Sequence, residues 1–140
     1  MRFRNLARPA LLALLALSSV ASAQVTSNYG MRQDPFHKGA RMHSGIDIAA
    51  PTGTPVVATG DGWVTFAGWR GGYGYMIEIQ HPSGHSTRFA HLSRILIAQS
   101  QPIRRGTVIG LIGSTGRSTG PHLHYEVRFN GKPLDPRAFM

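Results

Sequence analysis

Cysteine is absent from the 140 residues of this chain, and acidic side chains are few. Without cysteine, no disulfide framework can form. Asp and Glu together number 6 against 15 Lys and Arg, which gives a formal net charge of +9 with histidine neutral. This balance favours anionic partners through long-range attraction. The basic residues are scattered, apart from Arg104-Arg105, and no basic helix or aromatic-interleaved run indicates a nucleic-acid-binding protein.

Long apolar runs are also scarce, with one exception near the N-terminus. The run from Leu11 to Val20 follows the basic segment 1–8 and precedes the small residues 21–23, the order typical of a secretory signal peptide. A membrane-spanning helix needs about 20 apolar residues, so this run is short for a permanent anchor. We therefore expect residues 1–23 to be a cleaved signal peptide and the protein to be exported, either periplasmic or secreted. With no cysteine near the cleavage site to accept a lipid, we expect no stable membrane insertion after cleavage.

The rest of the sequence leaves little room for helices. Glycine and proline recur at short intervals and cut residues 24–140 into pieces of strand length. In segment 75–80, odd-numbered residues share one expected face and even-numbered residues the other. The expected strands cover residues 46–50, 54–58, 62–67, 75–80, 86–91, 95–98, 107–112 and 122–128. Period-two alternation with short turns predicts one all-β domain over residues 24–140, a compact antiparallel β sandwich or barrel.

Three short segments carry the residue types that bind zinc: His43-Ser-Gly-Ile-Asp47, a single His91, and His122-Leu-His124. A catalytic zinc needs three nitrogen or oxygen ligands and one open position. The segments offer more ligands than that, which leaves histidines for proton transfer. Each pattern also has a plain structural interpretation, with Asp47 accepting hydrogen bonds in a turn and His43 in solvent.

The expected strand 122–128 gives its histidines a direction. Because alternate residues share a face, His122, His124 and Glu126 would lie opposite Leu123 and its apolar neighbours. The apolar side can then face the core while the imidazoles line an open groove. By itself His-x-His is a weak signal, since an incidental polar strand face has the same pattern.

Other candidates carry less information. His81 and His85 repeat the four-residue spacing of a ligand pair, but the intervening Pro-Ser-Gly predicts a hairpin tip with both histidines in solvent. Trp69 and Tyr73 are candidates for substrate contacts beside a glycine-rich loop. Ordinary turn geometry explains those glycines equally well.

Three longer motifs resemble a known family, the lysostaphin and LytM-type zinc metallopeptidases of family M23. They are His43-Ser-Gly-Ile-Asp47-Ile-Ala-Ala-Pro, Phe-Ala-His91-Leu-Ser, and Gly113-Ser-Thr-Gly-Arg-Ser-Thr-Gly-Pro-His122-Leu-His124-Tyr-Glu. The likeness runs from about Tyr29 to the C-terminus, and the motifs lie in the family's order. The resemblance implies a sandwich of the lipoyl-like, duplicated hybrid motif type with the metal in an open groove.

The resemblance also implies roles for five residues. His43, Asp47 and His124 match the family's zinc ligands, with one Zn²⁺ per chain. His91 and His122 match its two catalytic histidines, which move protons and stabilise the oxyanion. Which of these two is the general base stays open. The implied substrate is the peptide part of peptidoglycan, and for an exported enzyme without a wall-binding module we expect cleavage of D-alanyl-diaminopimelate cross-links by a monomer.

Two alternatives belong to other classes of protein. The first is a non-catalytic peptidoglycan-binding or amidase-activating domain, which the complete set of five residues argues against. The second is a carrier domain, because Arg105-Gly-Thr-Val-Ile-Gly is similar to the glycine turns of lipoyl-like sandwiches. A carrier needs a lysine at a hairpin tip and a cytoplasmic location, and the expected signal peptide opposes the latter.

Overall fold

The structure is a computed structural model that describes residues 24–33 and 40–139. The expected signal peptide, residues 1–23, lies outside the described part of the chain. Within that part, no helix has the length and apolar character needed to cross a membrane.

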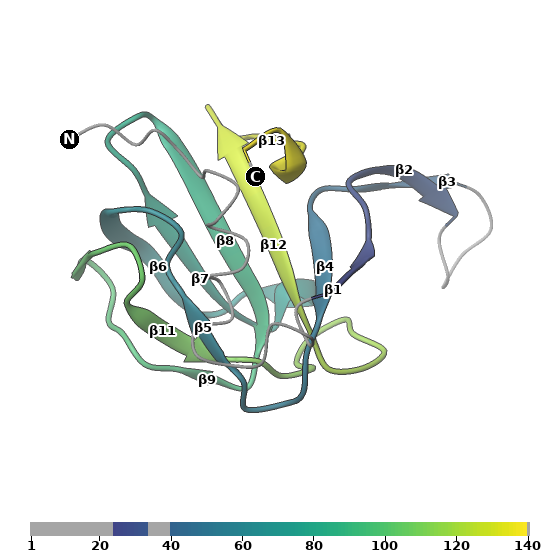
Figure 1. The fold of residues 1–140 in the computed structure, drawn as a ribbon, viewed down its shortest axis with the longest axis horizontal. Coiled ribbons are helices and arrows are strands. Elements are labelled where there is room, and N and C mark those ends of the chain that lie inside the picture. The colour runs from purple at the N-terminus through teal and green to yellow at the C-terminus, as the bar shows by residue number, and fades with distance from the viewer. Residues whose placement is uncertain (1–23, 34–39, 140) are drawn as a thin grey trace.

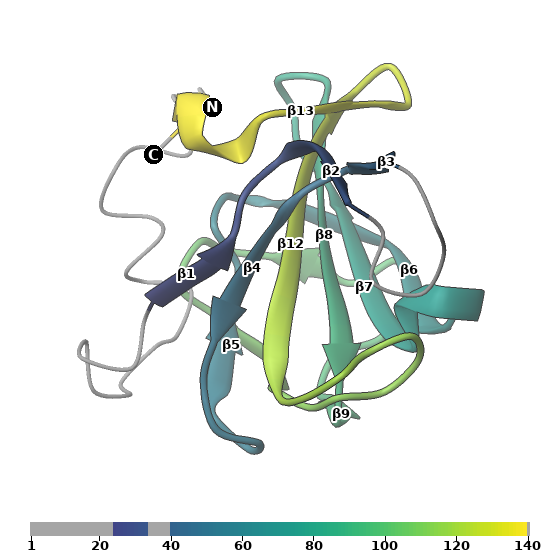
Figure 2. The ribbon, with the colours of Figure 1, turned by 90° about the vertical axis from the view of Figure 1, so that its right-hand side faces the viewer.

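The main sheet has eight strands, all paired antiparallel (Figure 1). In order across the sheet they are β1 (Gln24–Ser27), β4 (Ile46–Ala49), β12 (His122–Phe129), β8 (His85–Leu92), β7 (Tyr75–Gln80), β6 (Gly62–Trp69) and β10 (Pro102–Ile103), and β13 (Lys132–Leu134) also pairs with β12. Figure 2 shows β4, β12, β8 and β7 side by side, with β12 near the centre. This central strand carries the His-x-His pair.

A second sheet of three strands consists of β5 (Pro55–Val57), β11 (Val108–Leu111) and β9 (Arg94–Ile95). One buried apolar cluster joins residues of both sheets, including Val56, Ile77, Ile109 and Leu123. The hairpin of β2 (Gly30–Gln33) and β3 (Ala40–His43) extends away from the sheets in Figure 1. Two single-turn 3₁₀ helices, η2 (Gly71–Tyr73) and η3 (Pro136–Phe139), complete the described elements.

The prediction of an antiparallel all-β fold is confirmed, and the described strands form packed sheets without closing into a barrel. The expected strand 95–98 is largely wrong, because β9 covers Arg94–Ile95 alone. Five further strands were not predicted: β1, β2, β3, β10 and β13. Each is at most four residues long, so alternation over so few positions carries little signal.

Alternation was predicted for β12 and β7, and burial in the structure can be compared with it. In β12, Leu123, Tyr125 and Val127 join the apolar core, as the spacing predicts. In β7, Ile77 and Ile79 join the core cluster, whereas Met76 is fully buried outside that cluster and Tyr75, at the start of the strand, is 41% exposed. The pairing of β7 with β8 is irregular between residues 75 and 77. Two steps along β7 face three along β8 there, so the extra residue of this bulge lies in β8.

Candidate metal centre

Strand register brings two of the predicted ligands together. Asp47 lies directly opposite His124 in the antiparallel pairing of β4 with β12. Side chains of directly opposed residues project from the same face, with Cβ atoms about 5 Å apart. Residues 77 positions apart in the sequence thereby become neighbours.

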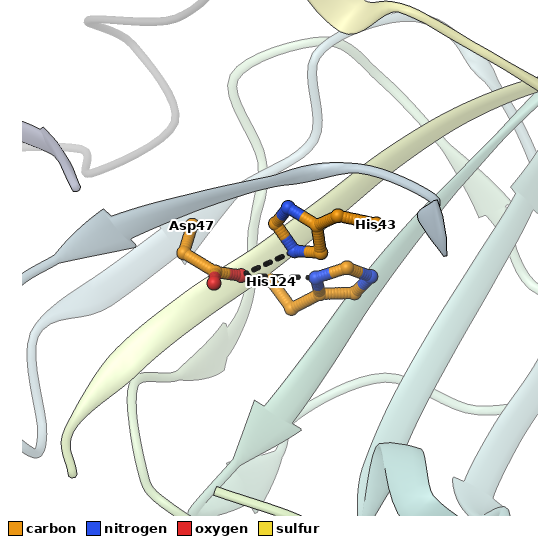
Figure 3. A group of neighbouring side chains, drawn as sticks. All are labelled: His43, Asp47 and His124. Carbon is orange, nitrogen blue, oxygen red and sulfur yellow. Dashed lines mark hydrogen bonds and ion pairs between the residues drawn. The ribbon is translucent and has the colours of Figure 1, made fainter. Parts of the chain in front are cut away.

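His43 joins them because the chain turns sharply between β3 and β4. Gly45 lies in this turn, and a Cβ atom there would collide with the Tyr125 carbonyl oxygen and lie 2.9 Å from the Glu126 side chain. Only glycine allows this close approach of the turn to β12. The turn places His43 over Asp47, where both side chains meet His124 (Figure 3).

The three side chains converge on one point. The Asp47 Oδ1 atom lies 3.3 Å from His43 Nε2 and 3.0 Å from His124 Nδ1, and one ligand atom from each residue lies within 4.8 Å of the others. Among the described residues, this is the one group of three or more His, Cys, Asp or Glu side chains with such geometry. Two imidazole nitrogens and a carboxylate oxygen form a donor set typical of zinc, so the residues fit this metal.

Hydrogen bonds fix which histidine nitrogens point inward. His43 Nδ1 lies 2.6 Å from the Asn28 carbonyl oxygen. Since a carbonyl oxygen accepts only, Nδ1 carries a proton, which leaves Nε2 as the nitrogen that faces Asp47 and could bind a metal. His124 has the opposite arrangement, because its Nε2 lies 2.8 Å from Glu126 Oε2 and its Nδ1 faces Asp47.

The electrostatics of the cluster favour a cation. Burial alone would lower the pKa of His124, but hydrogen bonds to Asp47 and Glu126 raise it to about 9. Burial would raise the pKa of Asp47, but hydrogen bonds from His124 and His43 hold it well below its usual range. In the metal-free protein a proton on His124 therefore balances the carboxylate, and a metal ion would take the place of that proton.

His91 and His122 lie beside this group. Their ring centroids are 4.8 Å apart, and the His91 ring is 5.9 Å from that of His124. His91 Nδ1 donates to the Thr115 carbonyl and His122 Nδ1 to the Gly120 carbonyl, each at 2.7 Å. Both rings therefore keep Nε2 available, and His122 Nε2 lies 3.6 Å from Asp47 Oδ1.

His91 has two further unusual properties. Burial lowers its pKa to about 4, so the imidazole is neutral near pH 7 and can accept a proton. Its backbone has φ of +61°, a conformation uncommon outside glycine and frequent at functional sites. All five predicted site residues thus come together in one place.

Sequence reasoning missed the groups that orient these histidines. The backbone carbonyls of Asn28, Thr115 and Gly120 leave no trace in the pattern of residue types. Glu126 was placed on the histidine face without a function, and it is fully buried against His124. Its position two residues after His124, on the same strand face, is the signal that indicates this contact.

The remaining candidates have structural positions. His81 was expected in solvent, but it is 2% exposed, and its ring lies between the Asp61 carbonyl oxygen and Thr87 Oγ1 at 2.8 Å each. His85 bonds instead to Ser83 Oγ, so the pair forms no second metal group among the described residues. Tyr73, a candidate substrate contact, directs its hydroxyl to Glu126.

Known proteins resemble the chain in sequence. The DD-carboxypeptidase/endopeptidase Mpg of Neisseria meningitidis is 53% identical over 113 residues, which cover 81% of this chain and 26% of that protein. The peptidoglycan DD-endopeptidase ShyA of Vibrio cholerae is 43% identical over 113 residues, covering 80% of this chain and 26% of its own length. This chain thus spans about a quarter of the length of these curated relatives.

Solved structures agree with the fold. A zinc-containing peptidase from Vibrio cholerae superposes with a TM-score of 0.78 at 41% identity, covering 83% of this chain and 36% of that one. The catalytic domain of lysostaphin from Staphylococcus simulans gives a TM-score of 0.77 at 33% identity and covers 85% and 92%. The family model described as peptidase family M23 matches residues 41–136, which contain all five site residues. The chain belongs to peptidase family M23.

Proposed function

We propose that this protein is a zinc-dependent endopeptidase that hydrolyses the peptide cross-links of peptidoglycan. The observation that carries the proposal is the convergence of His43, Asp47 and His124 within 4.8 Å, beside two further histidines with free Nε2 atoms. The names of the relatives from Neisseria and Vibrio support the substrate class. A domain that only bound peptidoglycan would have no need of this complete set.

The proposed ligands are His43 through Nε2, Asp47 through its carboxylate and His124 through Nδ1. Bound zinc supplies Lewis-acid chemistry, polarising a carbonyl and lowering the pKa of a coordinated water to roughly 7. A zinc ion held by these three side chains would have a fourth position for water or substrate, as in catalytic zinc sites. Each chain holds a complete set of residues, so the proposed activity needs no second copy and is consistent with a monomer.

His91 and His122 are proposed to handle protons. The Nε2 atom of either ring can take a proton from the attacking water and pass one to the leaving amine. Once Nε2 has taken up that proton, the ring can donate a hydrogen bond from it to the developing oxyanion. The neutral state of His91 near pH 7 suits it to accept a proton.

The finer proposal concerns bond and compartment. The relative ShyA is named a peptidoglycan DD-endopeptidase, which supports D-alanyl-diaminopimelate cross-links as the bond cleaved. We further propose that residues 1–23 act as a signal peptide, that residues 24–140 form the peptidase domain, and that the protein works in the periplasm or outside the cell. The basic composition suits an anionic cell envelope.

Incubation with purified sacculi tests the proposal. The protein is added with zinc or with a chelator, and released muropeptides are identified by mass. We expect cross-linked dimers to disappear only when zinc is present, and the product masses identify the bond. If the protein binds sacculi but releases nothing at any zinc concentration, it is a binding or amidase-activating module.

A further inference from the structure

A buried carboxylate lies behind the metal centre, on the side away from Asp47. Glu126 is fully buried, and ionised carboxylates are strongly disfavoured in such positions unless several donors surround them. Four side chains supply them: Oε2 contacts His124 Nε2 and Ser44 Oγ at 2.8 Å each and the Tyr73 hydroxyl at 2.9 Å, and Oε1 contacts Arg128 Nη1 at 2.6 Å.

This surrounding determines the charge of Glu126. Ser44 and Tyr73 donate hydrogen bonds to Oε2, and the Arg128 guanidinium, which always carries a positive charge, pairs with Oε1, so the group is held as a carboxylate. An ionised carboxylate has no proton to donate and can only accept. The hydrogen atom in the contact between His124 and Glu126 therefore belongs to His124 Nε2.

The proton on Nε2 determines the state of Nδ1, the other nitrogen of the His124 ring. A neutral imidazole carries one proton, so a proton held at Nε2 leaves a lone pair on Nδ1. That nitrogen lies 3.0 Å from Asp47 Oδ1, at the point where the three ligand atoms converge. In the opposite tautomer Nδ1 would carry the proton and could not bind a metal.

We propose that Glu126 is a positioning residue for the metal centre, which holds the His124 proton on Nε2 and orients the ring so that Nδ1 faces the zinc. This inference rests on the proposed function, because it presupposes zinc at the site. Carboxylates that accept from the far nitrogen of a metal-binding histidine fix its tautomer and increase its basicity.

Glu126 is itself fixed from three parts of the fold. Ser44 belongs to the turn between β3 and β4, Arg128 to β12, and Tyr73 to η2. The Tyr73 hydroxyl also accepts a hydrogen bond from Arg88 Nη1 at 3.0 Å, and Arg88 pairs with Glu78 at 2.7 Å. Tyr73 therefore links Glu126 to the Arg88–Glu78 pair.

Zinc affinity tests the inference. The variants are Glu126→Gln, which keeps the size and removes the charge, and Glu126→Leu, which removes the acceptor. Competition with a coloured chelator measures zinc affinity, and the visible spectrum of the cobalt(II)-loaded protein reports the ligand geometry. We expect affinity to fall about 10-fold in the glutamine variant and about 100-fold in the leucine variant, each with an altered cobalt spectrum.

Glu78→Gln is the matched control. Glu78 is also paired with an arginine on the main sheet, but its contacts link it to Glu126 only through Arg88 and Tyr73, and it does not contact His124. We expect this variant to keep the zinc affinity and cobalt spectrum of the parent protein. Thermal unfolding of each protein in chelator separates loss of folding from loss of metal binding.

Three outcomes decide the matter. Folded Glu126 variants that bind zinc as tightly as the parent, with an unchanged cobalt spectrum, would overturn the inference. So would an equal loss of affinity in Glu78→Gln, because the effect would then be a general one of the polar network. If the parent protein itself binds no zinc, the proposed function fails, and the inference fails with it.

Discussion

At the scale of single residues, the five side chains of the site fall into two groups by geometry. His43, Asp47 and His124 direct donor atoms at one point, whereas His91 and His122 present Nε2 beside it. His122 and His124 are two residues apart on one strand face, yet their hydrogen bonds differ. His122 donates from Nδ1 to a backbone carbonyl, and His124 donates from Nε2 to a carboxylate.

Alanine substitutions test the proposed division between metal binding and proton transfer. We expect His124→Ala to lose both zinc and cleavage, because a ligand is removed. His91→Ala should keep stoichiometric zinc and lose cleavage by about 100-fold or more, as expected for a lost acid or base. Metal analysis after gel filtration and muropeptide release measure the two properties. Equal zinc loss in both variants would contradict the division of duties.

His81 makes a separate prediction about stability. Its Nδ1 donates to the Asp61 carbonyl, and in the neutral ring its Nε2 accepts from the Thr87 hydroxyl. Burial lowers the pKa of His81 below its ordinary value of 6.5. The unfolded chain therefore binds this proton more readily than the folded one, and stability is lost as the pH falls through 6.5.

Denaturant unfolding in chelator, at about pH 7.5 and about pH 5.5, measures this loss. His81→Gln keeps a donor and an acceptor but cannot titrate, so we expect it to lose less stability on acidification than the parent protein. At the higher pH the variant should be less stable by about 1–2 kcal/mol, because its hydrogen bonds fit less well. An identical pH dependence in both proteins would show that His81 does not contribute.

At the scale of elements, the loop between β11 and β12 holds the end of β8 in place. The Thr115 carbonyl accepts a hydrogen bond from His91 Nδ1. The Thr115 hydroxyl donates to the Leu92 carbonyl and accepts from the Tyr75 N–H. Gly74 packs directly against this residue. A Cβ atom at position 74 would lie 2.5 Å from the Thr115 carbonyl carbon. The two loops can therefore approach each other this closely only because residue 74 has no side chain.

Gly74→Ala should therefore displace Thr115 and tilt His91. We expect cleavage to fall by about 10- to 100-fold, since small displacements of catalytic groups are costly, while zinc remains bound. The control is Gly53→Ala, which also has positive φ, +91°, but no atom within 4 Å of the added Cβ. It should lose about 1–2 kcal/mol of stability to backbone strain alone and retain cleavage. Equal activity in the two variants would contradict the proposed contact.

At the scale of the whole molecule, folding and metal binding rest on different residues. The core that joins the two sheets is apolar and continuous, with Ile46, Phe89, Leu92 and Ile112 fully buried. None of the three proposed ligands belongs to this cluster. The domain should therefore fold without zinc, unlike small domains whose folding depends on a metal.

Removal of zinc should nevertheless lower stability. A ligand that binds only the folded state stabilises it by about 2.7 kcal/mol when its free concentration is 100 times its Kd. We expect the unfolding temperature to fall when chelator is added, with the circular dichroism of the folded protein retained below the transition. His124→Ala should show no such shift. Loss of the folded spectrum in chelator would contradict an independent core.

Much of the fold could be predicted because β structure leaves a local pattern. The alternation of β12 and the turn residues around β6 and β7 are visible within a few positions, and so are the motifs around His43 and His122. The very short strands could not be predicted from the sequence, because such a strand forms only through pairing with another strand. The extra residue of β8 opposite β7 likewise has no local signal, because a bulge is a property of the paired strands.

The sequence by itself determined the class of fold, the residue types of the site and the family. Tertiary structure decided how those residues act together. Register placed Asp47 opposite His124, and distant carbonyls selected the inward nitrogens of His43 and His91. Glu126 became a partner of His124 only once Tyr73, Ser44 and Arg128 surrounded it. The physical reason is range: side-chain alternation is set by neighbouring residues, whereas hydrogen-bond direction and burial depend on segments far apart in the chain.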